Sequence, residues 1–157
     1  MTIGKGTLGE FQDAERTALM VLGMHRSGTS ALAGVLSHMG ADLPNNLMAP
    51  TEMNAKGFFE SQKMMLLNDD LLASAGLAWH SLQRFPQDWF ESPKASEYLV
   101  KATSVLKEEF GGSHLFLMKD PRICKLLPLW HQALEEVGCR PLHVPDQQLR
   151  KSRWTAP

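Results

Sequence analysis

The chain has 157 residues, a length that predicts a single domain with room for a hydrophobic core. It carries 16 Lys and Arg residues against 17 Asp and Glu, a net charge of −1, so no overall basic field is available to hold a nucleic-acid backbone or an anionic membrane. With 43% hydrophobic and 21% charged residues, the composition is that of a globular protein and excludes a disordered or fibrous one. Because the net charge is close to zero, any anion-binding site must depend on a local group of cations.

The N-terminal part of the chain predicts a strand, a glycine-rich turn and a helix. Residues 1–16 are polar and aperiodic, and we expect them to form a flexible leader. Residues 18–22 are a short apolar run stopped by Gly23, which is typical of a strand buried on both faces of a parallel sheet. Apolar residues then recur at helical spacing through residues 28–39, and Gly40 ends that helix.

The middle of the chain predicts a long loop followed by two helices. Residues 41–60 contain two prolines and three asparagines, and loops of this length often carry function. We expect a helix over about 61–75, then a connection over 78–92 that contains Trp and Pro. The next helix spans 93–110, with Ser92 as its N-cap, proline at its first position and two glycines after its end.

The C-terminal part repeats the alternation of strand and helix. Residues 115–118 and 141–144 are candidate buried strands, and a helix covers roughly 123–137 between them. Pro128 either kinks that helix or marks a fresh start. Residues 145–157 are polar and aperiodic, so we expect an irregular tail.

Alternating buried strands and amphipathic helices predict an α/β fold with helices flanking a parallel sheet, over a domain of residues 17–144. The sheet is expected to be incomplete, and its exposed edge would suit a second copy of the chain. Cys124 and Cys139 have neither redox-motif nor zinc-site spacing, which favours a reduced, cytoplasmic protein. No apolar stretch resembles a signal peptide or a membrane span, so no membrane role is expected.

The turn between the first strand and its helix has the pattern of a phosphate-binding loop. Gly23 and Gly28 give the two-glycine frame of the nucleotide-binding P-loop and Ser30 the final hydroxyl, with Thr29 where a lysine usually stands. Such a frame turns backbone N–H groups and a helix N-terminus toward an anion, and Arg26 adds a cation. The alternative is that the two glycines only form a tight strand–helix turn.

Residues 24–30 (MHRSGTS) resemble the 5′-phosphosulfate-binding loop of sulfotransferases, in which a Lys or Arg precedes Ser-Gly-Thr-[Ser/Thr]. Residues 54–60 (NAKGFFE), 119–124 (KDPRIC) and 127–130 (LPLW) are similar to segments of bacterial members of that family. The resemblance covers roughly residues 18–144. It implies a P-loop fold, 3′-phosphoadenosine-5′-phosphosulfate (PAPS) as sulfate donor, no metal, and transfer to the hydroxyl of a small-molecule or carbohydrate acceptor.

The same resemblance implies roles for the loop residues. Arg26 would contact the bridging oxygen and stabilise the leaving phosphate, which is the charge that develops in sulfuryl transfer. The residues that it implies for cofactor binding are His25, Arg26, Ser27, Gly28, Thr29 and Ser30. The family's 3′-phosphate motif has no clear counterpart after residue 144, where Arg150 and Ser152 are candidates by residue type alone.

A general base must also remove the acceptor's proton, and the sequence offers several candidates. Glu60 is preferred because it ends the long loop after the aromatic pair Phe58 and Phe59, where an acceptor would lie. A solvated glutamate in the first turn of a helix is the alternative. His25 and His80 remain open as bases, although His80 is more typical of a packed histidine.

Two further cations follow the second predicted strand. Lys119 and Arg122 lie at its carboxyl end, where open α/β sheets bind ligands, and we expect them to hold sulfate or an anionic acceptor together with Arg26. Their alternative is a salt bridge with Asp120 or exposure to solvent. Asp120 also supports a rival function, a small-molecule kinase using Mg-ATP, which Thr29 opposes. A non-catalytic nucleotide- or anion-binding module is the third hypothesis.

Overall fold

The computed structural model describes residues 15–24, 26–52 and 57–145 and consists of four α-helices, one 3-10 helix and three strands. In chain order these are β1 (Arg16–Leu22), α1 (Thr29–His38), α2 (Gln62–Ser74), the 3-10 helix η1 (Asp88–Glu91), α3 (Pro93–Phe110), β2 (Leu115–Lys119), α4 (Ile123–Glu136) and β3 (Cys139–Pro145). The strands form one parallel sheet in the order β2-β1-β3. The predicted α/β fold with helices flanking a parallel sheet is thus confirmed.

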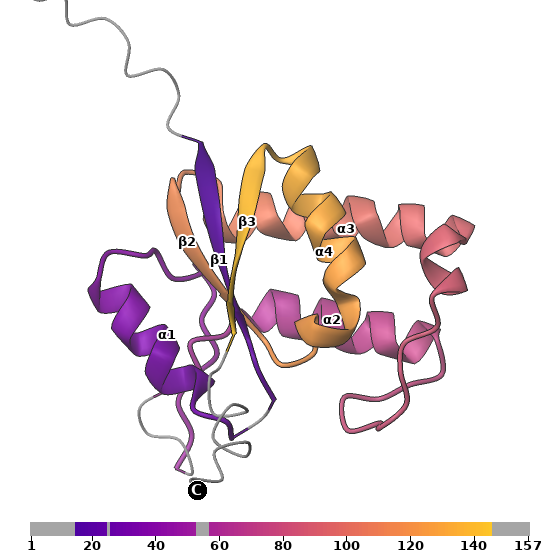
Figure 1. Cartoon of the computed structure of the whole chain (residues 1–157), viewed down its shortest axis with the longest axis horizontal. Helices are drawn as coiled ribbons and strands as arrows, with labels where there is room; N and C mark the ends of the chain where they lie inside the picture. The colour runs from indigo at the N-terminus through magenta and orange to yellow at the C-terminus, as the bar shows by residue number, and fades with distance from the viewer. Residues whose placement is uncertain (1–14, 25, 53–56, 146–157) are drawn as a thin grey trace, which may run out of the picture.

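Helices cover both faces of this sheet, with α1 on one face and α2, α3 and α4 on the other (Figure 1). Side chains of β1 alternate between two cores. Ala18 and Met20 pack into the larger core with the three helices, whereas Leu19 and Val21 pack on the α1 side with Ala33. Because both faces of the central strand are buried, its sequence is a continuous apolar run rather than an alternating one.

The strands are longer than the apolar runs that predict them. β1 begins at Arg16 and β3 at Cys139, two residues before the expected start in each case, because these two residues pair across the sheet. Arg16 also donates from Nε to the Ser113 carbonyl and from Nη2 to the Phe110 carbonyl, at 2.8 and 2.6 Å. Pairing between distant segments therefore extends both strands.

Two helix details bear on the expectations. Pro128 does not mark a fresh start, because α4 runs through it as one helix from Ile123 to Glu136. Ser92 occupies the N-cap position of α3, but its hydroxyl donates to the Trp89 carbonyl at 2.6 Å instead of capping the helix. That bond closes η1, a short helix that the sequence did not predict.

The segment between α1 and α2 contributes to the sheet edge. The Asp42 amide donates to the Leu115 carbonyl and the Leu117 amide donates to the Asp42 carbonyl, both at 2.9 Å, so a single bridge covers the outer side of β2. Within the described residues, β3 pairs with β1 on one side and with no strand on its other side, so β3 is the open edge of the sheet. The expected exposed edge is therefore β3.

Candidate functional site

The loop of residues 23–28 joins the central strand β1 to the N-terminus of α1. Gly28 precedes the helix with a φ of 94°, a left-handed conformation that favours glycine. The Ser27 amide and hydroxyl both donate to the Met24 carbonyl, at 3.3 and 2.6 Å, which closes the turn. Because the first N–H groups of a helix have no partner within it, the loop ends beside a set of donors and the positive end of the α1 dipole.

Arg26 lies in this loop with an exposed side chain and a φ of 61°. That left-handed backbone costs a non-glycine residue about 1–2 kcal/mol, so the loop holds Arg26 in place at some cost in stability. Thr29, which stands at the usual lysine position, is 4% exposed. His25, a predicted cofactor ligand, lies outside the described residues. The exposed cation of the loop is therefore Arg26.

Lys119 ends β2 with its ammonium beside the end of the loop. Its Nζ donates to Ser30 Oγ at 3.0 Å, to the Phe58 carbonyl at 2.8 Å and to Glu60 Oε1 at 2.6 Å. An ammonium has three N–H donors, so these contacts use all of them. Three segments far apart in the sequence thus meet at the carboxyl end of the sheet, and two predicted site residues, Lys119 and Glu60, contact each other directly.

The bond from Lys119 fixes how the Ser30 hydroxyl can act. A lysine ammonium donates and cannot accept, so Ser30 Oγ is the acceptor in this contact. The hydroxyl proton of Ser30 is consequently left to donate to another group. At the N-terminus of α1, such a donor suits an anion.

Glu60 is a buried and paired carboxylate. Its side chain is 7% exposed, and the residue precedes the N-cap Ser61 of α2, so the alternative of a solvated first-turn glutamate is wrong. Burial raises the pKa of Glu60 above its ordinary value, although the hydrogen bond and charge of Lys119 act to lower it. A carboxylate with a raised pKa is a better proton acceptor than an exposed one.

Arg122 makes two ion pairs instead of facing solvent. Its Nε lies 2.6 Å from Asp69 Oδ1 and its Nη1 lies 3.1 Å from Asp120 Oδ1, with the Arg122 side chain 10% exposed. The salt bridge with Asp120 that the sequence left open is therefore present, and Asp69 adds a second. An anion would have to compete with both carboxylates for this guanidinium, and the sulfate-binding role of Arg122 stays a prediction.

Asp120 belongs to a hydrogen-bonded network that ties β2 to α2 and α4. Its Oδ1 also accepts from the Arg122 amide at 2.9 Å, and its Oδ2 accepts from Asn68 Nδ2 at 3.0 Å. Asn68 Oδ1 in turn accepts from Trp130 Nε1 at 2.9 Å. Sequence reasoning missed Asn68 and Asp69, because a polar residue within an apolar helical stretch gives no signal of its distant partner.

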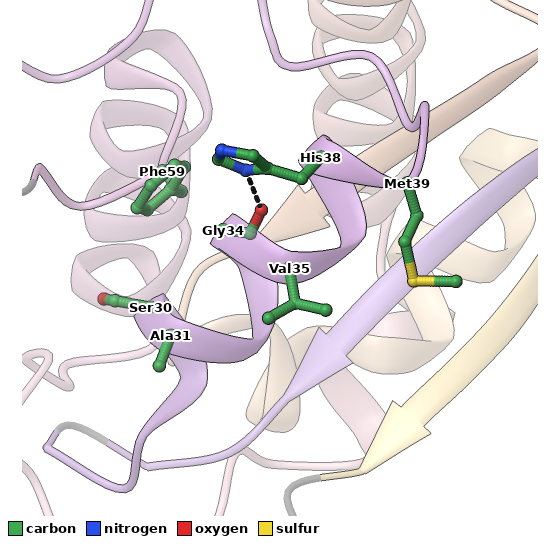
Figure 2. A pocket seen from close by; sticks show the side chains of 7 residues that line it. All are labelled: Ser30, Ala31, Gly34, Val35, His38, Met39 and Phe59. Atoms are coloured by element: carbon green, nitrogen blue, oxygen red, sulfur yellow. Dashed lines mark hydrogen bonds between the residues drawn. The ribbon is translucent and has the colours of Figure 1, made fainter.

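An apolar pocket of about 570 Å³ lies against the outer face of α1 (Figure 2). It is lined by Ser30, Ala31, Gly34, Val35, His38, Met39 and Phe59. Its volume is within the range of small-molecule sites. Ser30 belongs both to this pocket and to the Lys119 contacts, so the pocket adjoins the end of the loop of residues 23–28.

Phe59 and His38 shape this pocket. Phe59 has a left-handed φ of 56°, and its ring lies across Gly34, where an added Cβ would come 3.4 Å from Phe59 Cζ. His38 Nδ1 lies 2.7 Å from the Gly34 carbonyl, which can only accept, so Nδ1 donates and the neutral ring keeps Nε2 as an acceptor. The pocket therefore combines apolar walls with a hydroxyl and an imidazole.

The remaining candidates lie apart from this arrangement or outside the described residues. His80 is exposed, with its ring edge-on to Trp79 at a centroid distance of 5.2 Å. Cys124 Sγ lies 3.9 Å from the Gly23 carbonyl, and burial raises the pKa of its thiol, which keeps it protonated. Arg150 and Ser152 are not among the described residues.

Comparison with models of known families, with curated proteins and with solved structures gave no match. Within residues 15–145, apart from the two short gaps, every helix is too short or too polar to cross a membrane.

Proposed function

We propose that this chain is a sulfotransferase-like P-loop domain that binds PAPS and transfers its sulfuryl group to an acceptor hydroxyl. The observation that carries this proposal is the position of the loop. Residues 23–28 follow the central strand, open the N-terminus of α1 and end beside the buried ammonium of Lys119. Open α/β sheets bind their ligands at this edge.

Three kinds of group would hold the 5′-phosphosulfate there. The N-terminus of α1 supplies backbone donors and a positive dipole end, and the Ser30 hydroxyl supplies a donor that Lys119 orients. Arg26 supplies the exposed cation. In this arrangement the lysine that is absent from the loop has a counterpart in Lys119, which acts through Ser30 rather than by direct contact with the phosphate.

The transfer itself would proceed in line. The acceptor oxygen bonds to sulfur while the bond between sulfur and the bridging phosphate oxygen breaks, and the leaving phosphate takes the negative charge. Arg26 and the α1 N-terminus stabilise that charge. Glu60 takes the proton of the acceptor hydroxyl, for which its raised pKa is favourable.

The apolar pocket beside α1 is our proposed place for the body of the acceptor. It meets the donor site at Ser30, and Phe59 links it to the base candidate at the next position. An acceptor whose apolar part fills this pocket would present its hydroxyl near the loop.

The geometry counts against the rival kinase function. A kinase needs an acidic residue that is available to Mg²⁺ at the end of the neighbouring strand. Asp120 holds that position, but both of its carboxylate oxygens already accept hydrogen bonds, from Arg122 and from Asn68. Magnesium would have to displace these partners from a side chain that is 1% exposed.

Isothermal titration calorimetry tests the proposal directly. The chain is titrated with 3′,5′-adenosine bisphosphate, then with ADP in the presence and absence of Mg²⁺. We expect the bisphosphate to bind more tightly than ADP and to bind without Mg²⁺. A magnesium-dependent preference for ADP would support the kinase instead, and no binding of either nucleotide would contradict the proposal.

The role of Arg26 has a matched control in Arg140, an exposed arginine near the amino end of β3 and thus at the opposite end of the sheet. Arg26→Ala is expected to weaken bisphosphate binding strongly, whereas Arg140→Ala is expected to leave it unchanged. Equal effects of the two substitutions would indicate a nonspecific charge effect and remove Arg26 from the site.

A further inference from the structure

Two histidines meet on the face of the sheet that α1 does not cover, away from the contacts of the phosphate loop. His131 belongs to α4 and His143 to the edge strand β3. Their Nε2 atoms lie 2.7 Å apart, and their rings are nearly parallel, at an interplanar angle of 18° and a centroid distance of 4.8 Å. Neither residue has a part in the proposed transfer.

This contact restricts the protonation of the pair. Two Nε2 atoms at hydrogen-bond distance require one donor and one acceptor, so at least one imidazole is neutral. Burial, and then the nearby charge of His143, lower the pKa of His131, which favours its neutral form. The neutral imidazole is the form that ligates metal ions.

The spacing of the two nitrogens is close to that of two ligands on one ion. Imidazole nitrogens lie about 2.0–2.1 Å from a bound zinc ion, so two of them on one tetrahedral ion stand about 3.3–3.4 Å apart. The observed separation of 2.7 Å is about 0.6 Å shorter than this. His143 is exposed and His131 is half-buried, and binding requires their two rings to turn apart by that amount.

The fold holds both ligands on regular structure. α4 and β3 are consecutive elements, joined by Val137 and Gly138 alone, and Gly138 makes the turn with a left-handed φ of 67°. Ligands carried by a helix and a strand are positioned more precisely than ligands on loops. The scaffold therefore sets the distance between the two rings before any ion arrives.

We propose that His131 and His143 form a binding site for a divalent late first-row transition metal ion, with Zn²⁺ as the reference ion, held by the two Nε2 atoms. Imidazole is a preferred ligand of these ions. Among the described residues no group of three or more His, Cys, Asp or Glu side chains gathers in a way that could hold a metal, so the proposed site has two protein ligands and would leave the other coordination positions to water. The ion is thus exchangeable, and it ties the edge strand to α4.

Zinc binding by the untagged, metal-free chain tests this site. We expect calorimetry to detect Zn²⁺ binding that weakens at least about tenfold in His131→Ala and in His143→Ala. Because an ion that binds only the folded state stabilises it, Zn²⁺ should also raise the Tm of the unmodified chain, and raise it less in both variants. His114→Ala is the matched control, because His114 is exposed and lies just before β2. This variant should bind zinc as the unmodified chain does.

A second variant separates metal binding from the hydrogen bond between the rings. His143→Gln keeps a polar side chain that can contact His131 but removes an imidazole ligand, so the fold should persist and zinc affinity should fall. Zinc affinity equal to that of the unmodified chain in His143→Gln, or an equal loss in His114→Ala, overturns the proposal. Both results are independent of PAPS binding, so this site and the proposed function fail separately.

Discussion

Lys119 and Glu60 form a buried ion pair, with Nζ 2.6 Å from Oε1, that joins the end of β2 to the segment leading into α2. Their side chains are 4% and 7% exposed, so solvent screens the pair very little. The same ammonium contacts Ser30 at the start of α1. One lysine thereby connects the start of α1, the candidate base and the sheet.

Removal of Lys119 is expected to destabilise the fold. Lys119→Met leaves Glu60 as an unpaired buried carboxylate, which costs about 3–5 kcal/mol in the free energy of unfolding. The double variant Lys119→Met/Glu60→Gln removes that buried charge and should recover part of the loss. Urea denaturation of the two variants measures both values. A loss below about 1 kcal/mol for Lys119→Met would mean that the pair behaves as a surface salt bridge.

The raised pKa of Glu60 predicts a specific pH dependence of stability. The folded chain binds this proton more tightly than the unfolded chain, so the contribution of Glu60 is fully present below its ordinary pKa of 4.5. It is lost as the pH rises through 4.5 and then through the raised pKa of the folded state. The free energy of unfolding of the unmodified chain, relative to Glu60→Gln, should therefore fall across that window. A difference that is constant with pH, or that rises, contradicts the prediction.

The left-handed backbone at Arg26 predicts a difference between two substitutions. Glycine adopts a φ of 61° without the Cβ penalty of about 1–2 kcal/mol, so Arg26→Gly should be more stable than Arg26→Ala by about 1 kcal/mol. Both variants should lose affinity for 3′,5′-adenosine bisphosphate because both lack the cation. Thermal unfolding and calorimetry measure the two effects, and equal stabilities would indicate that the loop relaxes around alanine.

A larger side chain at Gly34 should fill the apolar pocket. In Gly34→Leu the new Cβ lies about 3.4 Å from Phe59 Cζ and the rest of the side chain enters the pocket. We expect weaker fluorescence enhancement of 1-anilinonaphthalene-8-sulfonate, an anionic dye whose aromatic rings fluoresce in apolar sites, with bisphosphate binding unchanged. Leucine also favours a helix more than glycine does, so stability should not fall. Ala73→Leu, at an exposed position on α2, is the control that should keep probe binding.

Elements whose ends are set by their own residues could be predicted from the sequence. α3 begins at Pro93 and ends at Phe110, just before two glycines, as expected from proline at the first helical position and glycine after the last. α2 begins after Ser61, whose side chain accepts from the Met64 amide at 3.0 Å. The chemistry that determines these ends is local, and it is visible in the sequence.

Elements that depend on a distant partner were predicted less well. The first residues of β1 and β3 are in strands because Arg16 pairs with Cys139, and neither residue belongs to an apolar run. Pro128 fits within α4 without ending it, although its ring removes one backbone donor. Pairing across the sheet decides where the two strands begin.

The candidate site divides in the same way. The position of the loop between β1 and α1 could be predicted from its glycines, because it depends on local backbone geometry alone. The ion pairs could not, since Lys119 and Glu60 are 59 positions apart in the sequence and Arg122 and Asp69 are 53 apart. Sequence alone put cations at the carboxyl end of β2 and offered Asp120 as a partner, which Arg122 does contact, but it did not indicate the pairs with Glu60 and Asp69. The contact that links Lys119 to Ser30 could only be seen in the folded chain.

The strand order also has a consequence for how the chain folds. β1 pairs only with β2 and β3, both from the last third of the described chain, and Arg16 bonds to a carbonyl 97 positions away. During synthesis, the segment that carries the loop therefore emerges long before either neighbouring strand exists. Contacts of such long range slow folding, so the setting of the loop of residues 23–28 is among the last parts of the protein to form, and the nascent β1 is an apolar segment that stays exposed until then.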